Sequence, residues 1–530
     1  MGTKLFLKII STIGSLTFLS RILGYFRDLL IARLLGASFI SDAFFVSFKL
    51  PNLFRRLFAE GAMNSAFIPV ISGIKVKYGI SKSNQFLSQV LSIIFSILLP
   101  FLIIFEIFMP FIISMVAPGF EENFQKFQLT VELSRITFPF LLFICLSSLI
   151  GGYLNTMSKF AAMAFIPVIL NLSMLTALLS SDFFSSNQET ISMHLAFSIS
   201  FAGLVQLIWL IYNLKKNNVK LKLNDFTFFN FSNLSEDAKK LLYLFIPAAL
   251  GNGVYQLNLL IDMILASTLP DGSISYLYFA DRVNQLPLGV IGIALSTALL
   301  PILSKQIKEK AFDEASKSSN YCLQIGIIFS IPASIGLIFL SDLITNVLFV
   351  RGEFTINNAK LTSDALKAFC IGLPAFIFVK ILAVSFFSRE DTKTPVYVAI
   401  IAMIINLTLN LILIKSYLHV GLAIATSISS WFNFLILLFL SNKKKFITLH
   451  VETFKVLLKS ILASGIMGFI IYYILSNYFL EAQINNHFNE QILLVLGLII
   501  FGSFIYLILL YFLKAFYLFN FRLGEKNQTK

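Results

Sequence analysis

The stretch from Ser20 to Pro69 reads SRILGYFRDLLIARLLGASFISDAFFVSFKLPNLFRRLFAEGAMNSAFIP, and it places charges within segments otherwise apolar enough to span a bilayer. Its charged residues are Arg21, Arg27, Asp28, Arg33, Asp42, Lys49, Arg55, Arg56 and Glu60. A charge near the bilayer centre costs at least about 2.5 to 3.5 kcal/mol, so such residues usually face a partner or a water-filled cavity. The stretch therefore predicts a polar intramembrane site.

The composition is that of an integral membrane protein. Of the 530 residues, 57% are hydrophobic and only 13% are charged, which leaves no bulk for a soluble catalytic domain. The net charge of +14 could suggest a nucleic-acid partner. The basic residues outside the apolar runs lie in short loops, however, where the positive-inside rule accounts for them. We therefore expect no nucleic-acid binding and no enzymatic activity.

Apolar runs of about 17 to 25 residues predict about fourteen transmembrane helices in an all-α polytopic protein. The first follows Lys4 and Lys8 and is expected to be retained rather than cleaved. The predicted spans are 11–36, 40–72, 87–116, 129–154, 160–181, 190–214, 241–268, 275–304, 319–349, 361–387, 394–415, 420–441, 453–477 and 490–514.

Lysines gather in alternate loops, on the side of Lys4 and Lys8, whereas the intervening loops hold mostly acidic residues. This bias predicts that both termini are cytoplasmic. The basic loops contain Lys75, Lys77 and Lys82, then Lys215, Lys216, Lys220, Lys222, Lys239 and Lys240, then Lys305, Lys308, Lys310 and Lys317, and finally Lys443, Lys444 and Lys445.

The two halves of the chain match each other at a nearly constant offset, which indicates two six-helix lobes related by a parallel repeat. Matching pairs are Asp28 and Asp262, Pro69 and Pro301, Pro139 and Pro374, and Asn171 and Asn406. The predicted parts are an N-lobe over 1–215, a cytoplasmic linker over 216–240, a C-lobe over 241–445, and two further helices with a cytoplasmic tail over 446–530. Repeats of this kind commonly enclose a central transport site.

The charges of the first lobe fall on helical faces. At about 100° per residue, Arg21 and Asp28 share one face and Arg27 lies roughly 120° round from Arg21. Asp42, Lys49, Arg56 and Glu60 also share a face, provided that the helix continues through Pro51. Intramembrane salt bridges or snorkelling helix ends are the alternative interpretation.

Arginine in both lobes favours an anionic ligand. Arg27 and Arg55 interrupt spans of the first lobe, and Arg282 interrupts a span of the second. The planar guanidinium donates paired hydrogen bonds to phosphate oxygens and never loses its charge. Asp28, Asp42 and Glu60 are expected to orient or neutralise these cations.

A second, weaker group consists of Asp262, Asn406, Asn410 and Thr426. One carboxylate with neutral oxygens suits a small hard cation such as sodium. Asparagines in membrane helices also hydrogen-bond across helices without binding any ion, and that interpretation stays open.

The segments SRILGYFRD, SDAFFVSFKLPNLFRRLFAEGA, FADRVNQLPLG and DTKTP resemble the MurJ/MviN family of lipid II flippases, within the multidrug/oligosaccharidyl-lipid/polysaccharide exporter superfamily. The resemblance covers essentially the whole chain. It implies a fourteen-helix flippase with a cationic cavity and a groove for the lipid tail along the last two helices. The implied substrate is an undecaprenyl-diphosphate-linked disaccharide pentapeptide.

Carried over by motif, the resemblance implies substrate-binding roles for Arg21, Arg27, Asp28, Asp42, Lys49, Arg55, Glu60 and Arg282. It also implies a sodium site at Asp262, Asn406, Asn410 and Thr426. Some members of the family have a carboxylate where this chain has Asn410, so the site here carries less charge. Gln285 similarly stands where some members have a glutamate.

The expected function is lipid II flipping from the cytoplasmic to the periplasmic leaflet of the bacterial inner membrane by alternating access. The expected protein is a monomer that can associate with cell-wall synthesis proteins. A flippase for another undecaprenyl-linked oligosaccharide needs the same cations and is the nearest alternative. An ion-coupled antiporter of small solutes and a structural scaffold for cell-wall enzymes are the others.

Overall fold

The computed structural model describes residues 3–57, 64–184, 186–219, 221, 235–478 and 488–514. These residues form helices joined by short turns, and no strand occurs among them. The chain divides into two compact units. Unit 1 comprises Met1–Ser275 with Arg351–Phe354, and unit 2 comprises Tyr276–Val350 with Thr355–Lys530. The lobe boundaries expected from the sequence repeat stay predictions.

In unit 1, helix α1 packs on α8, α2 packs on α5, and α6 packs against both α3 and α9. Helix α10 packs on α3. The helices are α1 (Thr3–Leu35), α2 (Phe39–Arg55), α3 (Asn64–Ile107), α4 (Met109–Val116), the 3₁₀ helix η2 (Pro118–Glu122), α5 (Phe124–Thr137), α6 (Phe140–Thr156), α7 (Phe160–Ala164), α8 (Ile166–Phe183), α9 (Gln188–Lys216) and α10 (Glu236–Ser267).

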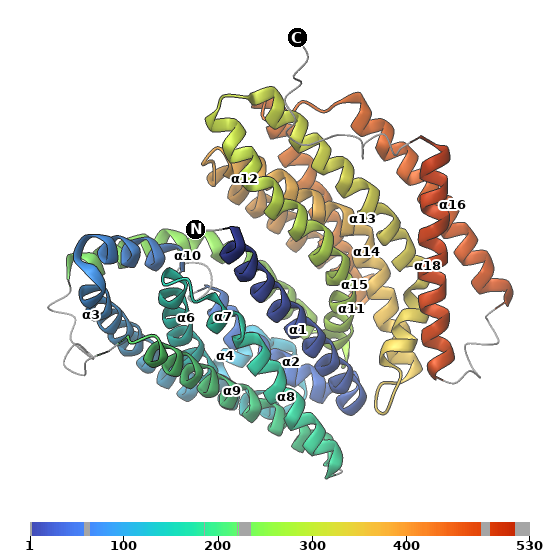
Figure 1. Cartoon of the computed structure of the whole chain (residues 1–530). Coiled ribbons are helices and arrows are strands. Elements are labelled where there is room, and N and C mark those ends of the chain that lie inside the picture. The colour runs from blue at the N-terminus through green and yellow to red at the C-terminus, as the bar shows by residue number, and fades with distance from the viewer. Residues whose placement is uncertain are drawn as a thin grey trace. The chain divides into compact units, whose positions relative to one another are not determined.

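In unit 2, helix α14 packs between α13 and α15, and α16 and α18 both pack on α13 (Figure 1). The π-helical turn η4 interrupts the span formed by α11 and α12 and packs on α14. The elements are α11 (Ser273–Pro287), η4 (Leu288–Ile293), α12 (Ala294–Lys308), α13 (Phe312–Phe349), α14 (Ile356–Phe387), α15 (Lys393–Lys443), α16 (Val451–Tyr478) and α18 (Phe488–Phe512).

The predicted all-α polytopic membrane fold is confirmed. Ten helices among the described residues are long and apolar enough to cross a membrane, and each of the predicted spans overlaps helical segments. The two counts differ for physical reasons. Helix α15 carries two predicted spans, α1 contains six charges, and α2 has only 17 residues. In α10 only the shorter segment Gln256–Ser267 is apolar enough.

Two backbone breaks separate spans within long helices. Gly79 has φ 81° and divides α3 between the predicted spans 40–72 and 87–116. Leu418 has φ 49° and divides α15 between the predicted spans 394–415 and 420–441. A left-handed conformation ends a helix at little cost for glycine, but it is unfavourable for leucine and must be offset by surrounding packing.

Helix α2 continues through Pro51 and ends at Arg55, so Asp42 and Lys49 lie on one helix. Arg56 follows its last residue, and Glu60 of the predicted shared face lies outside the described residues. The capping box between Ser38 and Ser41 fixes its start, because each side chain hydrogen-bonds the backbone N–H of the other. Helix α3 begins at Asn64, and residues 58–63 between the two helices lie outside the described residues.

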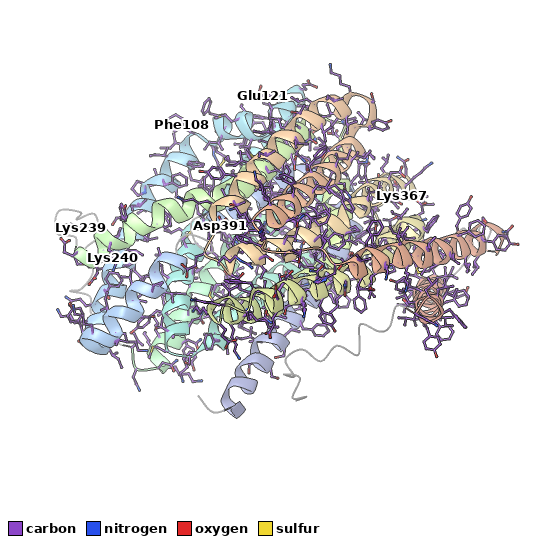
Figure 2. All side chains as sticks on the ribbon, turned by 90° about the horizontal axis from the view of Figure 1, so that it is seen from above. Phe108, Glu121, Lys239, Lys240, Lys367 and Asp391 are labelled. Atoms are coloured by element: carbon purple, nitrogen blue, oxygen red, sulfur yellow. The ribbon has the colours of Figure 1, made fainter. Side chains whose placement is uncertain are left out.

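Basic residues mark the helix ends, as expected from the sequence. Lys239 and Lys240 project from the first turns of α10, and both are exposed (Figure 2). Lys239 pairs with Glu236 at 2.8 Å within the same turn. Lys443 is the last residue of α15, and Lys444 follows it as the C-cap. Exposed pairs of this kind add little stability.

The DTKTP motif builds the turn between α14 and α15. Asp391 Oδ1 accepts a hydrogen bond from the Thr394 N–H at 3.0 Å, and Asp391 Oδ2 accepts from Thr394 Oγ1 and Lys444 Nζ, both at 2.7 Å. Burial alone raises the pKa of Asp391, but these hydrogen bonds outweigh it and lower the pKa from 3.8 to about 2. The carboxylate thus joins the start of α15 to its end.

Replacing this carboxylate should lower the melting temperature of the purified protein. For Asp391→Asn we expect a loss of up to about 1 kcal/mol, because the amide cannot form the partly exposed ion pair with Lys444, and Glu390→Gln is the matched control. Because the folded pKa is depressed, the stabilisation is complete above the ordinary pKa and is lost as the pH falls from about 4 towards 2. An Asp391→Asn protein that melts like the wild type at pH 7 would contradict this role.

Candidate functional site

Arg27 lies deep inside unit 1, on α1, with 5% of its surface exposed. Its Nη2 and Nε donate to Asp28 Oδ1 at 2.7 and 3.0 Å, and its Nη1 donates to Asn171 Oδ1 on α8 at 2.9 Å. Asp28 is 4% exposed. Asn171 in turn donates to the Ser20 carbonyl oxygen at 2.9 Å, which fixes the amide. The guanidinium is therefore held in one orientation by two helices.

The charges of α2 divide by burial along the helix. Asp42 is buried, Lys49 and Arg55 are half-buried, and Arg56 is exposed. Arg55 Nε donates to Asn52 Oδ1 at 3.0 Å, one turn earlier. Because the helix continues through Pro51, Arg55 rather than Arg56 is the arginine turned towards the protein. Of the two remaining predicted residues, Arg21 on α1 is exposed, and Glu60 lies outside the described residues.

The carboxylate of Asp42 is surrounded by donors from its own unit. Oδ1 accepts from the backbone N–H and hydroxyl of Ser275 at 2.9 and 2.7 Å, and Oδ2 accepts from the Gly272 N–H at 2.8 Å. Lys126 Nζ lies 3.3 Å from Oδ2. Asp42 was predicted as a substrate-binding residue. In this structure its oxygens bind protein groups, so it holds α2 to the turn after α10.

Lys126 was missed by the sequence analysis. It is 3% exposed, its Nζ lies 2.7 Å from Asp271 Oδ1 and 3.3 Å from Asp42 Oδ2, and it stands 4.0 Å from the centre of the Phe120 ring. The sequence offered one signal: Lys126 is a lysine in the predicted loop between spans 87–116 and 129–154, which otherwise carries the acidic residues Glu121 and Glu122. Position alone could not show that it is buried between two carboxylates.

Unit 2 contributes Arg282, which is half-buried on α11. Its Nη2 donates to Tyr278 Oη at 2.9 Å, and its guanidinium lies 4.9 Å from the centre of the Tyr278 ring. The neighbouring Gln285 donates to Asp281 one turn earlier. The Tyr278 side chain therefore orients the Arg282 guanidinium through both its hydroxyl and its ring.

A second cation of unit 2, Lys380, was also missed. It interrupts the apolar run of α14 after Pro374, and its side chain is exposed although it lies in the middle of a spanning helix. Its stem passes beside η4, where a Cβ added to Gly292 would lie 3.4 Å from Lys380 Cδ. π-Helical turns often occur at functional sites. The lone lysine in the span was the sequence signal that could have found it.

The predicted ion-site residues fall in both units. In unit 2, Asn410 Nδ2 donates to Asn406 Oδ1 at 2.7 Å, and Asn406 Nδ2 donates to Thr426 Oγ1 at 3.3 Å. In unit 1, Asp262 Oδ2 accepts from Asn258 Nδ2 at 3.3 Å. Among the described residues, no group of three or more His, Cys, Asp and Glu could hold a metal ion.

Comparison with known proteins gives concordant results. A family model described as "Lipid II flippase MurJ" matches residues 31–494. A protein of Rickettsia prowazekii (strain Madrid E) named "Probable lipid II flippase MurJ" is 38% identical over 501 residues, covering 94% of this chain and 96% of the relative. A protein of the same name from Buchnera aphidicola subsp. Acyrthosiphon pisum (strain APS) is 38% identical over 469 residues, covering 88% and 90%.

Two solved structures show how far the fold extends. "Lipid II flippase MurJ, inward closed conformation" has a TM-score of 0.79 at 30% identity, covering 95% of this chain and 99% of that chain. An inward-facing multidrug resistance MATE family transporter has a TM-score of 0.65 at 13% identity, covering 82% and 97%. At that identity the second similarity concerns the fold alone.

Proposed function

The chain belongs to the lipid II flippase MurJ family, and on that premise we propose that it moves lipid II from the cytoplasmic to the periplasmic leaflet of a bacterial inner membrane by alternating access. The observation that carries the proposal is a buried guanidinium, Arg27, on a helix of a multi-pass membrane protein. Such a cation is costly in a membrane unless it serves a partner or a substrate. The activity is transport, so no bond of the substrate is broken.

The diphosphate of the substrate is the proposed ligand of Arg27, Arg55 and Arg282. Two or three guanidinium groups match the charge of a diphosphate, and their paired N–H groups match its oxygens. Arg55 and Arg282 each hydrogen-bond a neutral side chain, Asn52 and Tyr278 respectively, among their contacts. These hydrogen bonds orient the two guanidinium groups, and orientation favours paired bonds to phosphate oxygens.

The remaining predicted residues have supporting roles in this proposal. Asp28 neutralises Arg27 when no substrate is bound, which the 2.7 Å contact between them supports. Arg21 and Lys49 add positive charge along α1 and α2, and Glu60 balances it. Asp42 closes one end of unit 1 through its bonds to Gly272 and Ser275. Alternating access requires that such a closure opens during the cycle.

The polyprenyl tail is proposed to stay in lipid along α16 and α18. Large apolar side chains on both helices are exposed, among them Phe469, Ile500 and Phe504. Ordinary lipid contact would produce the same exposure. In the proposed topology both termini are cytoplasmic, the protein works as a monomer, and cell-wall synthesis proteins are its neighbours.

Resetting the empty transporter requires energy, and we propose the membrane potential as its main source, at roughly 2.3 kcal/mol per charge per 100 mV. Sodium is the secondary source. Asn406, Asn410 and Thr426 carry the neutral oxygens that sodium prefers. In this structure Asn406 Oδ1 and Thr426 Oγ1 accept hydrogen bonds from amide groups, which a bound ion would have to replace. In the repeat, Asp262 stands at the position that Asp28 holds in the first lobe.

The sodium proposal predicts a shift in thermal stability that does not depend on transport. Replacing choline with sodium should raise the melting temperature by about 2 °C or more, because a ligand that binds only the folded state stabilises it. Asp262→Asn should remove the shift, whereas Asp313→Asn, in the first turn of α13, should keep it. Equal melting in both salts would leave Asp262 with a structural role.

Depletion of the protein in living cells tests the proposed function. Lipid II should accumulate within the cell while new peptidoglycan synthesis stops, and a plasmid-borne copy should reverse both effects. Accumulation of a different undecaprenyl-linked precursor would identify another substrate. Normal wall synthesis after depletion would contradict the proposal.

A further inference from the structure

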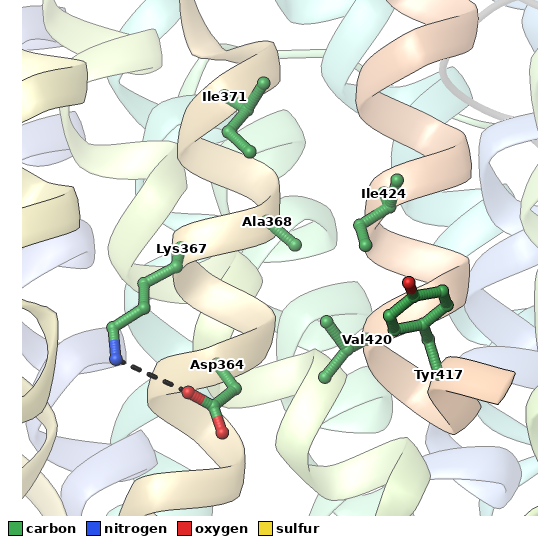
Figure 3. Close-up of a pocket in the computed structure, with 7 residues that line it drawn as sticks. All are labelled: Asp364, Lys367, Ala368, Ile371, Tyr417, Val420 and Ile424. Atoms are coloured by element: carbon green, nitrogen blue, oxygen red, sulfur yellow. Dashed lines mark hydrogen bonds and ion pairs between the residues drawn. The ribbon is translucent and has the colours of Figure 1, made fainter. Parts of the chain in front are cut away.

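A groove of about 420 Å³ opens between α14 and the part of α15 that follows the break at Leu418, wholly within unit 2. Figure 3 shows the two helices facing each other, with Ala368 on one and Val420 and Ile424 on the other. The groove is lined by Asp364, Lys367, Ala368, Ile371, Tyr417, Val420 and Ile424. None of these residues belongs to the site described above.

The groove crosses the boundary between the polar and apolar parts of α14. The first turns of this helix carry Lys360, Asp364 and Lys367, whereas the run from Ala368 to Val379 contains no charged residue. A helix changes from polar to apolar where it enters the hydrocarbon layer. One end of the groove therefore lies at headgroup level, and the other end lies beside the acyl chains.

The facing helix shows the same division. Tyr417 stands beside the break in α15 and is 54% exposed. Tyrosine is enriched at the membrane–water interface because its ring is apolar and its hydroxyl is polar. Val420 and Ile424 continue along the groove as apolar lining, opposite Ile371, which is 53% exposed. The lining thus suits an amphiphile with an acyl chain.

The polar end of the groove has more carboxylates than ammonium groups among its ion-paired residues. Lys367 Nζ lies 2.9 Å from Asp342 Oδ2 and 3.4 Å from Asp364 Oδ1, so one lysine is shared by two acids. The carboxylate of Asp364 is 40% exposed and faces the groove. Lys360 precedes Asp364 by one turn on the same helical face and adds a cation nearby.

We propose that this groove binds one phospholipid whose headgroup carries both a primary ammonium and a phosphate, which is phosphatidylethanolamine. The ammonium pairs with Asp364, the phosphate lies towards Lys360 and Lys367, and one acyl chain follows Ile371 and Ile424. Phosphatidylglycerol has the phosphate but no cation for the carboxylates, so it binds less well. This inference does not depend on the transported substrate.

The test measures which lipid stays bound to the full chain. The protein is reconstituted in nanodiscs of equal phosphatidylethanolamine and phosphatidylglycerol, released into mild detergent, and analysed by native mass spectrometry. One exposed ion pair changes a binding constant by on the order of two- to fivefold, so we expect retention of phosphatidylethanolamine over phosphatidylglycerol in that range.

Two variants and one control make the result specific. Asp364→Asn should reduce the preference to near one, and Val420→Phe should reduce retention of both lipids by filling the groove. Glu452→Gln removes a carboxylate from an ion pair of similar exposure on α16 and should behave like the wild type. Absence of a preference in the wild type, a preference for phosphatidylglycerol, or an unchanged preference in Asp364→Asn would each overturn the proposal.

Discussion

Arg27→Ala should abolish growth of cells that depend on this protein, and it should also lower the stability of the purified chain. The substitution removes the guanidinium whose Nη2 lies 2.7 Å from Asp28 Oδ1, and it leaves that carboxylate 4% exposed without its cation. Breaking a buried pair by removing one partner costs about 3 to 5 kcal/mol. Complementation of a depletion strain and the melting temperature are the two measurements.

The double variant Arg27→Ala/Asp28→Ala separates structure from substrate binding. Without both charges no buried charge is left unpaired at this position, so stability should recover to within about 1 to 2 kcal/mol of the wild type. Transport should not recover, because the guanidinium that pairs with the diphosphate is still missing. Growth of cells that carry the double variant would mean that Arg27 serves only to neutralise Asp28.

Asp42→Asn should be the most damaging single-atom change in unit 1. The amide presents two N–H donors where the carboxylate accepts from the Gly272 and Ser275 backbone N–H groups and from Lys126. At least one buried donor then loses its acceptor and Lys126 loses one of its two anions, for an expected loss of about 2 to 4 kcal/mol. Thermal unfolding in detergent measures the loss.

Asp182→Asn is the matched control for Asp42→Asn. Asp182 pairs with Arg33 at 3.3 Å, but the two side chains are 33% and 47% exposed. Solvent screens an exposed pair, so its loss should cost less than about 1 kcal/mol. Equal melting temperatures for the two variants would contradict this account, because they would show that the buried bonds of Asp42 stabilise unit 1 no more than an exposed ion pair does.

The spans were predictable because apolar runs of sufficient length have few alternatives in a membrane. The breaks at Gly79 and Leu418 fall between predicted spans, where lysines and polar residues interrupt the apolar pattern. The family could also be recognised from the sequence, because the motif around Arg27 and Asp28 is long and specific. The family match confirms that resemblance.

The partners of the charged residues could not be predicted in the same way. Asp42 and Ser275 are far apart in sequence, so helical periodicity says nothing of the hydrogen bonds between them. Lys126 looked like a loop lysine, because burial between two carboxylates depends on tertiary packing. Periodicity gives the face of one helix, whereas a site needs the faces of several.

The most direct test of the central claim is the rate at which new lipid II reaches the outer leaflet. Spheroplasts of a depletion strain are labelled with a precursor, and a membrane-impermeant enzyme then cleaves only the lipid II exposed outside. We predict that the cleavable fraction falls to background on depletion, returns with the wild-type chain, and stays at background with Arg27→Ala/Asp28→Ala. An undiminished cleavable fraction after depletion would contradict the assignment of lipid II flipping to this protein.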